Sequence, residues 1–277
     1  MGLTTKIETC DSTVNPTAGC NGCELWNHRT GGTCYAAGIH NRFRAKKPGA
    51  PSPYPRAFHV VENRPGRMAI AAGWSDLTGK PRPDKPWLDG LPRVVFISDM
   101  ADAFCEQISW VYLRQEVLGA VRGRVLAGTA NRHFWLWYTK RPAMAGLFAR
   151  WLQQVHHEIC WPENLMLVAS ATDQNRLKSR ARELLSIPCR FKGLSLEPFH
   201  GPVNLRAAGI GRGSIDWIIA GGNSDRRGVR IEEETVRSLR VQCLQLQIPL
   251  FFKQWGHGRP GREIDGDRIE EMMKVEG

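Results

Sequence analysis

The sequence predicts an α/β fold in which parallel strands alternate with helices. Short apolar runs rich in Val, Ile, Phe and Trp recur from residue 93 onward. Most of them are continuously apolar, as strands covered on both faces are. Between these runs, apolar residues recur with the 3.6-residue period of helices that pack on a sheet. Such alternation requires crossover connections, so the candidate architectures are a closed or partial barrel and a doubly wound sheet.

Six apolar runs account for the expected strands. They are residues 93–99, 133–140, 165–173, 190–198, 215–222 and 249–255. A further short strand is expected around Thr13 to Thr17. Four helices are expected between the strands, with apolar faces formed by Trp110, Leu113, Val117 and Val121; by Met144, Leu147, Phe148, Trp151 and Val155; by Leu177, Ala181, Leu184 and Leu185; and by Val236, Leu239, Cys243 and Leu246.

The length and composition are compatible with one large soluble domain or two small ones, and we expect a single domain. With 277 residues and 42% hydrophobic content, the chain can bury a sizeable core. It has no run of 18 or more apolar residues that would span a bilayer, and its first fifteen residues lack the apolar core of a signal peptide. We therefore expect a monomeric cytoplasmic protein without a membrane partner. Within the single domain 1–277, residues 1–92 would form long loops and basic, proline-rich segments, residues 93–256 the core, and residues 257–277 a C-terminal extension.

The excess of positive charge favours a polyanionic partner. The chain has 38 Lys and Arg residues against 27 Asp and Glu, a net charge of +11, which is typical of nucleic-acid-binding proteins. A basic surface without a specific partner is the alternative. Charge is concentrated in residues 40–56 and 224–230, and in the first segment Phe43 and Tyr54 are interleaved for stacking on a base. The basic residues of that segment are Arg42, Arg44, Lys46, Lys47 and Arg56.

Polar side chains follow the expected strands at the point where each strand ends. Because chemistry in parallel α/β folds lies at the carboxyl ends of the strands, these side chains are candidates for one functional edge. For any single one of them, an ordinary polar loop is the alternative. In chain order they are Ser98, Asp99 and Asp102; Thr139, Lys140 and Arg141; Ser170, Thr172, Asp173 and Gln174; Glu197; Gly221, Gly222 and Asn223; and Lys253 and Gln254.

Three of the eight cysteines, Cys20, Cys23 and Cys34, lie within fifteen residues of one another. The cysteines are too sparse for a disulfide scaffold, and clustered thiols in a reducing compartment indicate a metal site. Zinc would need a fourth ligand, which His28 or His40 could supply. An iron–sulfur cluster held by three thiolates would leave one iron open to a ligand from outside the chain, as a catalytic cluster requires.

A series of short motifs resembles, in the same order and over nearly the whole chain, a phage-associated protein family. That family has a three-cysteine signature, is regarded as radical S-adenosylmethionine (SAM)-like, and is related in outline to spore photoproduct lyase. One departure is that Cys23 lies close to Cys20, whereas the family more often places the middle cysteine close to the third. The motifs are TKIETCDSTVNPTAGC, CYA at 34–36, ISDMADAF, YTKRP, ATDQNR, SLEPFHGPVNL, IDWIIAGGNS, and PLFFKQWG followed by REIDG.

The resemblance implies a partial (β/α) barrel of about six parallel strands, of the radical SAM type, with a [4Fe-4S] cluster held by Cys20, Cys23 and Cys34. SAM would chelate the open iron, and an electron from a cellular donor such as flavodoxin would cleave it to a radical that abstracts hydrogen from the substrate. By analogy with radical SAM enzymes, the residues expected to bind SAM are Tyr35 at adenine, Ser98 and Asp99 at the methionyl amine, Ser170, Thr172 and Asp173 at the ribose, and Gly221 and Gly222, where backbone can approach closely.

The resemblance also implies a substrate, because family members occur beside genes for thymine hypermodification in phage DNA. We expect an isomerase that rearranges an amino-acid-modified thymine in DNA, in the cytoplasm of the host cell. An enzyme acting on a base within a duplex must extrude it, which calls for phosphate clamps and stacking side chains. The residues expected to bind the DNA substrate are Lys140, Arg141, Arg42, Arg44 and Trp255, with Trp26 as a second stacking candidate.

Three side chains are the candidates for catalysis. Glu197 and Lys253 would position a charged substituent of the substrate, and a structural ion pair is the alternative for both. Cys105 would donate a hydrogen atom to a product radical, and a small buried hydrophobe is the alternative for this residue.

Two other functions are compatible with these residues. A zinc-stabilised basic protein would attach to DNA without catalysis, with a steep dependence on salt. Alternatively, the same radical chemistry would act on RNA or on a free nucleotide. Metal analysis separates the zinc protein from the enzyme.

Overall fold

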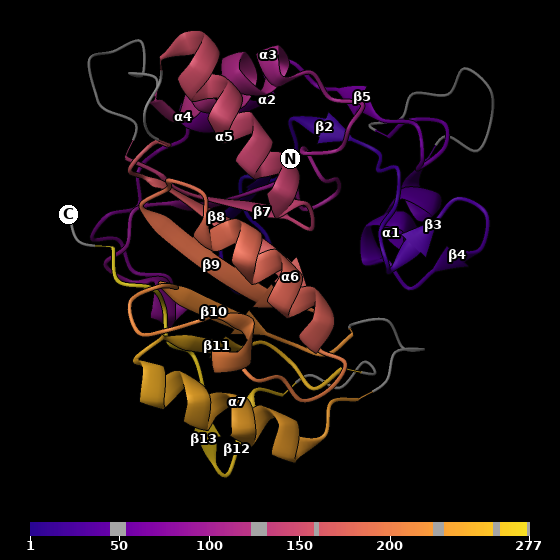
Figure 1. The fold of residues 1–277 in the computed structure, drawn as a ribbon. Helices are drawn as coiled ribbons and strands as arrows, with labels where there is room; N and C mark the ends of the chain where they lie inside the picture. The colour runs from indigo at the N-terminus through magenta and orange to yellow at the C-terminus, as the bar shows by residue number, and fades with distance from the viewer. Residues whose placement is uncertain (45–53, 123–131, 158–160, 224–229, 257–260, 276–277) are drawn as a thin grey trace. The chain divides into compact units, whose positions relative to one another are not determined.

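Strands and helices alternate in the computed structural model of the chain, which describes residues 1–44, 54–122, 132–157, 161–223, 230–256 and 261–275 (Figure 1). Seven strands form one sheet in the order β1-β6-β7-β8-β9-β10-β11. This order follows the chain without the reversal found in doubly wound sheets, and it is the order of a (β/α) barrel left open between its first and last strands. The predicted α/β class is confirmed, and the sheet has seven strands because the short N-terminal strand also joins it.

The chain divides into two compact units. Unit 1 comprises residues 1–77 and 92–139, and unit 2 comprises residues 78–91 and 140–277. These bounds cut across the expected segments 1–92, 93–256 and 257–277. None of the helices in the described ranges is both long and apolar enough to cross a lipid bilayer.

Unit 1 contributes three parallel strands to the sheet, β1 (Ser12–Val14), β6 (Val94–Ile97) and β7 (Phe134–Thr139). Val14 pairs with Ile97, and Ile97 pairs with Trp137, so the three carboxyl ends are in step. Every residue of β7 is buried, which explains its continuous apolar sequence. Two antiparallel pairs of two-residue strands accompany them, β2 (Thr17–Ala18) with β5 (Glu62–Asn63) and β3 (Trp26–Asn27) with β4 (Gly31–Gly32).

The helices of unit 1 begin with α1 (Tyr35–Phe43) and α2 (Arg67–Ala72). The predicted helix around Trp110 runs to Arg122 in three pieces, α3 (Trp110–Tyr112), the π-helical η2 (Leu113–Leu118) and α4 (Gly119–Arg122). The carboxylate of Glu116, in the π-helical piece, accepts the backbone N–H of Gly66 at 2.9 Å and of Met68 at 3.0 Å. Glu116 thereby satisfies backbone donors that the start of α2 leaves without helical partners.

Unit 2 contributes the other four parallel strands, β8 (Leu165–Ala171), β9 (Phe191–Leu196), β10 (Trp217–Ala220) and β11 (Leu250–Phe252). Helix α6 (Gln174–Leu185) runs across β8 and β9 in Figure 1. The remaining elements of the unit are α5 (Pro142–His156), α6 (Gln174–Leu185), α7 (Glu233–Leu246), the 3₁₀ turns η1 (Pro86–Leu88) and η3 (Arg206–Ala208), and the hairpin of β12 (Glu263–Ile264) and β13 (Asp267–Arg268).

The buried face of α5 differs from the predicted one. Leu147 and Val155, expected in the core, are exposed, whereas Ala145, Ala149 and Leu152 are buried beside Phe148. The prediction weighted large apolar residues, but a helix that packs closely buries its small residues instead. A side chain at the neighbouring Gly146 would already meet Ile187 at 3.7 Å. The buried faces predicted for α6 and α7 are confirmed, except that Leu185 is only half-buried.

The C-terminal extension is held within unit 2 by charged contacts. Arg237 and Arg240 on α7 reach Asp265 at 2.7 Å and Asp267 at 2.9 Å. The guanidinium of Arg262 lies over the ring of Trp87 at 4.6 Å. These contacts explain how a segment with only two short strands holds a defined position.

Helix α6 begins at a side-chain cap that can be tested. The carboxylate of Asp173 accepts the backbone N–H of Arg176 at 3.0 Å. Replacing Asp173 with alanine should lower the free energy of unfolding by about 1 kcal/mol at neutral pH, because this acceptor is lost. Urea unfolding measures the change, and Asp173→Asn, which keeps a capping oxygen but no charge, is the matched control.

The charge of Asp173 adds a dependence on pH. Burial tends to raise the pKa of Asp173, but hydrogen bonds from Arg176 and Thr172 outweigh it and hold the pKa below its ordinary value. A lowered folded-state pKa gives stability that is present above the unfolded pKa of about 4 and is lost as pH falls through the folded pKa. Thermal unfolding should show that the wild type is more stable than D173N near neutral pH. Below the folded pKa of Asp173, the two proteins should be equally stable. A gap that does not change with pH would contradict this assignment.

Candidate functional site

The carboxyl ends of the three strands in unit 1 carry the first group of predicted site residues. Asn15 follows β1, Ser98 and Asp99 follow β6, and Thr139 ends β7. The amide of Asn15 donates to the carboxylate of Asp99 and accepts the backbone N–H of Met100 at 3.0 Å. Asn15 thus fixes the turn after β6 from the neighbouring strand. It lies in the NPTAGC motif but was not singled out as a site residue.

The turn after β6 contains two buried polar residues, Ser98 and Asp99, whose surroundings are energetically unfavourable. Burial raises the pKa of the Asp99 carboxyl above its ordinary value, and the hydrogen bond from Asn15 only partly opposes this. Ser98 has a left-handed φ of 71° and is 5% exposed, and its Oγ has no hydrogen-bond partner among the described residues. Such a backbone costs about 1–3 kcal/mol and persists mainly at functional sites. The pair predicted to bind the methionyl amine is therefore a buried, polar and strained turn.

Arg67 is a candidate binding residue that the sequence did not reveal. It opens α2, and one of its guanidinium nitrogens lies 3.5 Å from the carbonyl oxygen of Asn15. Burial, and then the charge of Arg64, lowers the pKa of Arg67. Within the described residues, no carboxylate lies within ion-pair distance of its guanidinium. A half-buried cation without a counterion is suited to an anionic ligand, but no spacing or motif marks the residue in the sequence.

The cysteine loop consists of an anchor, a tight turn and a helix start. The backbone N–H of Cys20 donates to Phe58 O at 2.7 Å, and Cys23 exchanges two backbone hydrogen bonds with Trp26. The hairpin β3–β4 then leads to Cys34, which is the N-cap of α1. Gly32 is required here, because a Cβ at this position would lie 2.0 Å from Leu25 O at a φ of 150°. The loop is therefore a defined structure rather than an open tether between cysteines.

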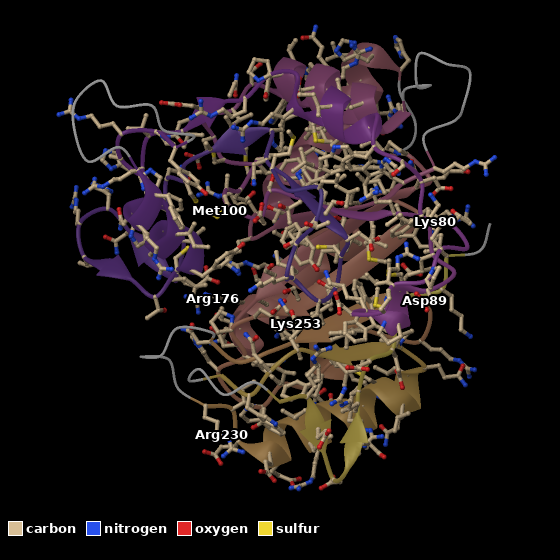
Figure 2. The ribbon with its side chains drawn as sticks, turned by 180° about the vertical axis from the view of Figure 1, so that it is seen from behind. Lys80, Asp89, Met100, Arg176, Arg230 and Lys253 are labelled. Carbon is tan, nitrogen blue, oxygen red and sulfur yellow. The ribbon has the colours of Figure 1, made fainter. Side chains whose placement is uncertain are left out.

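This loop is joined to the turn after β6. The hydroxyl of Tyr35, the first residue of α1, donates to the backbone carbonyl of Asp99. Gly19, beside Cys20, forms a parallel bridge with Ala101. Cys20 and Cys34 pack against an apolar cluster that contains Met100, which Figure 2 shows beside the indigo segment of α1. The fold thus brings the predicted cluster loop to the edge that carries Asn15, Ser98 and Asp99.

The three thiols of the cysteine loop are sulfur donors of the kind that a metal group requires. Cys20, Cys23 and Cys34 are half-buried, and Cys23 Sγ accepts the backbone N–H of Leu25 at 3.4 Å. Hydrogen bonds to sulfur and partial exposure are both features of protein iron–sulfur sites. In the described parts of the chain, no group of three or more His, Cys, Asp and Glu side chains is close enough to hold a metal ion as it stands. The donor chemistry fits a cluster, and the thiols must draw together to bind one.

The histidines proposed as a fourth zinc ligand lie in different surroundings. His40 is fully buried, and its Nε2 lies 2.8 Å from Pro55 O while its ring packs on Phe58. His28 is exposed, with its ring 5.6 Å from that of His59. His40 could serve as a ligand only by leaving the core, which makes the zinc alternative costly for this residue.

Asp102 and Cys105 form a buried group in unit 1. The Thr139 hydroxyl donates to the carboxylate of Asp102 at 2.9 Å, and the Cys105 N–H donates to the Asp102 carbonyl at 3.2 Å. Cys105 is 2% exposed, which agrees with the alternative of a small buried hydrophobe. A hydrogen-atom donor in this position would need a path to the substrate.

In unit 2, Glu197 and Lys253 follow β9 and β11 and form an ion pair of 2.7 Å between Nζ and Oε1. Ser195 donates its hydroxyl to the other carboxylate oxygen at 3.0 Å. The two side chains meet across the end of β10, where a Cβ on Gly221 would lie 3.3 Å from both Glu197 Oε1 and Lys253 Cβ. The side chains of Glu197 and Lys253 are 20% and 15% exposed, so the ion pair is mostly buried but still reaches the solvent. Figure 2 labels the position of Lys253.

The residues after β8 were predicted to bind a ribose. Thr172 donates its hydroxyl to Asp173 at 3.1 Å, and Asp173 caps α6 and pairs with Arg176. Ser170 is buried, and its carbonyl accepts from Arg180 at 2.7 Å. The structure gives the Asp173 carboxylate a role in the fold that the sequence prediction did not include.

The remaining predicted residues have mixed surroundings. A Cβ on Gly222 would lie 2.3 Å from Trp255 O, so the backbone that approaches this glycine is the protein's own. Trp255 is 8% exposed and packs on Phe252 at 4.7 Å, which leaves little of its ring for stacking on a base. Lys140 and Arg141 are half-buried at the start of α5, and Arg42 and Arg44 are exposed at the end of α1. Lys46, Lys47 and residues 224–229 lie outside the described residues.

A comparison with protein families matches residues 4–274 to a family described as protein of unknown function, DUF5131. No curated protein and no solved structure matches the chain.

The buried carboxyl of Asp99 gives a prediction about stability. A raised folded-state pKa means that ionising Asp99 opposes folding above the unfolded pKa of about 4 and has no effect below it. Asp99→Asn keeps an acceptor for Asn15 and removes the charge. It should increase the free energy of unfolding by on the order of 1 kcal/mol near pH 8, with the gain disappearing toward pH 4. Thermal unfolding across this range measures it, and a variant less stable than wild type at pH 8 would refute the account.

The contact between Gly222 and Trp255 gives a second prediction. Gly222→Ala should destabilise the fold by about 3 kcal/mol, because backbone atoms cannot yield as side chains do. Gly211→Ala is the matched control, since no atom lies within 4 Å of its Cβ position, and it should change stability by less than about 0.5 kcal/mol. Urea unfolding of the two variants compares them. Equal stability would mean that the backbone at Gly222 is not packed in this way.

Proposed function

Because the chain belongs to the DUF5131 family of proteins of unknown function, we propose its activity from its own residues together with the resemblance of its motifs to a radical SAM-like family: it is a radical SAM enzyme that modifies a nucleobase in DNA. It binds a [4Fe-4S] cluster through Cys20, Cys23 and Cys34, with SAM as cosubstrate. The reaction proposed is the rearrangement of an amino-acid-modified thymine during hypermodification of phage DNA. The enzyme works in the cytoplasm and takes its electron from a donor such as flavodoxin.

One observation carries this proposal. The cysteine loop meets the carboxyl ends of β1 and β6 through the Tyr35 contact with Asp99 and the packing of Cys20 and Cys34 toward Met100. In open parallel α/β sheets, ligands bind at the carboxyl ends of the strands. Three thiols at that edge, beside a buried carboxyl and an arginine with no carboxylate partner among the described residues, support a redox cofactor with a charged cosubstrate more than a structural metal.

Each described group of unit 1 has a role in this proposal. Asp99 and Ser98 accept and orient the ammonium of the methionyl part of SAM, and burial strengthens this interaction because water cannot compete for the charge. Arg67 binds an anionic group of the ligand, which explains an arginine with no carboxylate partner within the described residues. Tyr35 holds α1, and with it Cys34, at a fixed position relative to Asp99.

The cluster, when bound, supplies the electron that cleaves SAM and so generates the radical that acts on the substrate. The chain itself holds the thiolates, orients the cosubstrate and excludes water from the reacting groups. In unit 2, Glu197 and Lys253 position a charged substituent of the substrate by exchanging their mutual ion pair for contacts with it.

Single replacements of Cys20, Cys23 and Cys34 by alanine test the ligand assignment. Each should reduce the iron content of protein reconstituted without oxygen by at least about tenfold and abolish reductive cleavage of SAM, because each variant removes one of the three proposed thiolate ligands of the cluster. Iron and sulfide analysis and detection of 5′-deoxyadenosine are the measurements.

Cys189→Ala is the matched control. Burial raises the pKa of the Cys189 thiol to about 11, so it is a neutral core group and its loss should leave the iron content unchanged. Circular dichroism should show all four variants folded. A cysteine-loop variant that keeps both iron and SAM cleavage would exclude that residue as a ligand.

A further inference from the structure

The segment that surrounds the cysteine loop has an unusually one-sided charge. Residues 19–60 contain six Lys and Arg residues and one acidic residue, Glu24, a net charge of +5. The described parts of this segment, residues 19–44 and 54–60, are called the basic lobe here. They include β3, β4 and α1, which Figure 1 shows side by side.

Contacts between its three parts make the basic lobe one surface. Trp26 of β3 packs edge-on against Phe58 with ring centroids 4.9 Å apart, and His28 lies 5.6 Å from His59. The guanidinium of Arg44, after α1, donates to Arg56 O at 3.4 Å. The β3–β4 hairpin, the end of α1 and residues 54–60 therefore pack together, and their basic side chains lie on one surface.

Four exposed arginines lie in the basic lobe. They are Arg29, Arg42, Arg44 and Arg56. None of their guanidinium groups lies within ion-pair distance of a carboxylate in the described residues, whereas Arg237 and Arg240 of unit 2 are both paired. Four exposed arginines without counterions form a surface for a partner with several regularly spaced negative charges.

An exposed aromatic ring lies among these charges. Phe43, the last residue of α1, is 58% exposed and is flanked in the chain by Arg42 and Arg44. Phenylalanine is normally buried, because exposing its ring to water is unfavourable. An exposed ring with arginines on both sides of it in the chain suits a strand that offers both phosphates and an uncovered base face, as single strands do.

We propose that the basic lobe binds a single-stranded stretch of nucleic acid, with Phe43 stacked on an unpaired base and the four arginines on the backbone phosphates. The proposal rests on the proposed function for its purpose, since Cys20, Cys23 and Cys34 lie in the same lobe and a strand held there is close to the proposed cofactor. A duplex fits less well, because its bases are stacked on each other and present no free face to Phe43.

Binding of fluorescent oligonucleotides tests this proposal at several salt concentrations. The full chain should bind single-stranded DNA at least about tenfold more tightly than duplex DNA of the same sequence. Phe43→Ala should weaken binding of the single strand by about tenfold and leave its salt dependence unchanged, because it removes stacking and no charge. Arg42→Ala with Arg44→Ala should weaken binding and lower the slope of log affinity against log salt by about 1.4, which corresponds to two phosphate contacts.

Arg150→Ala with Arg182→Ala is the matched control, because it removes two exposed arginines from helices of unit 2. Its affinity should fall less than about threefold. An equal loss for both double variants would show that only net charge matters and would overturn the assignment of the lobe, as would tighter binding of duplex. A single-stranded RNA probe of the same sequence distinguishes the two polymers, and tight RNA binding that also depends on Phe43 supports the lobe while moving the substrate from DNA to RNA.

The same assay separates this proposal from the proposed function. Oligonucleotide binding by the basic lobe requires no iron, so it is measured on metal-free protein and on Cys20→Ala. If the Phe43→Ala variant loses binding of the single strand but loads iron and cleaves SAM normally, the result supports nucleic-acid binding by the basic lobe, independently of the cofactor chemistry. A wild type that loads iron and cleaves SAM but binds no single strand overturns the lobe and leaves the proposed cofactor chemistry standing.

Discussion

The hydrogen bond from the Tyr35 hydroxyl to the Asp99 carbonyl is the constraint on which the site in unit 1 depends. It connects the first residue of α1 to the turn after β6, two segments that are 64 positions apart in the chain. Because Cys34 caps α1 and Cys20 packs against the cluster that contains Met100, fixing this contact also fixes two of the three thiols. A loop that would otherwise be independent becomes part of the sheet edge where ligands of parallel α/β folds bind.

The same edge holds features that cost stability. A serine in a left-handed conformation, a carboxyl with a raised pKa and a half-buried arginine without a carboxylate partner in the described chain would each be removed by selection for stability alone. In unit 2, by contrast, the carboxylates of Glu197 and Asp173 have partners. Glu197 meets Lys253 because Gly221 leaves room above β10, and Asp173 caps a helix. The polar residues named in unit 2 therefore stabilise the fold, whereas those at the edge in unit 1 are suited to binding a ligand.

The sequence predicted the strands well, because a strand buried on both faces is a continuous apolar run and few other structures produce one. It also predicted that polar residues follow the strand ends, and Ser98, Asp99 and Thr139 do so in unit 1. Arg67 and the role of Asn15 were missed, since both depend on a long-range contact that no local pattern encodes. For Trp255, the sequence predicted a stacking role that the surroundings of the ring in the structure do not favour. A tryptophan after a strand looks exposed in the sequence, but the ring folds back onto Phe252.

The most direct test of the central claim is electron paramagnetic resonance of the reduced wild-type protein after anaerobic reconstitution with iron and sulfide, recorded with and without SAM. If three thiolates hold a cluster with one open iron, the reduced protein gives an iron–sulfur signal, and SAM changes that signal because it binds directly to the cluster. A protein that takes up zinc, or one whose iron–sulfur signal is the same with and without SAM, would contradict the account.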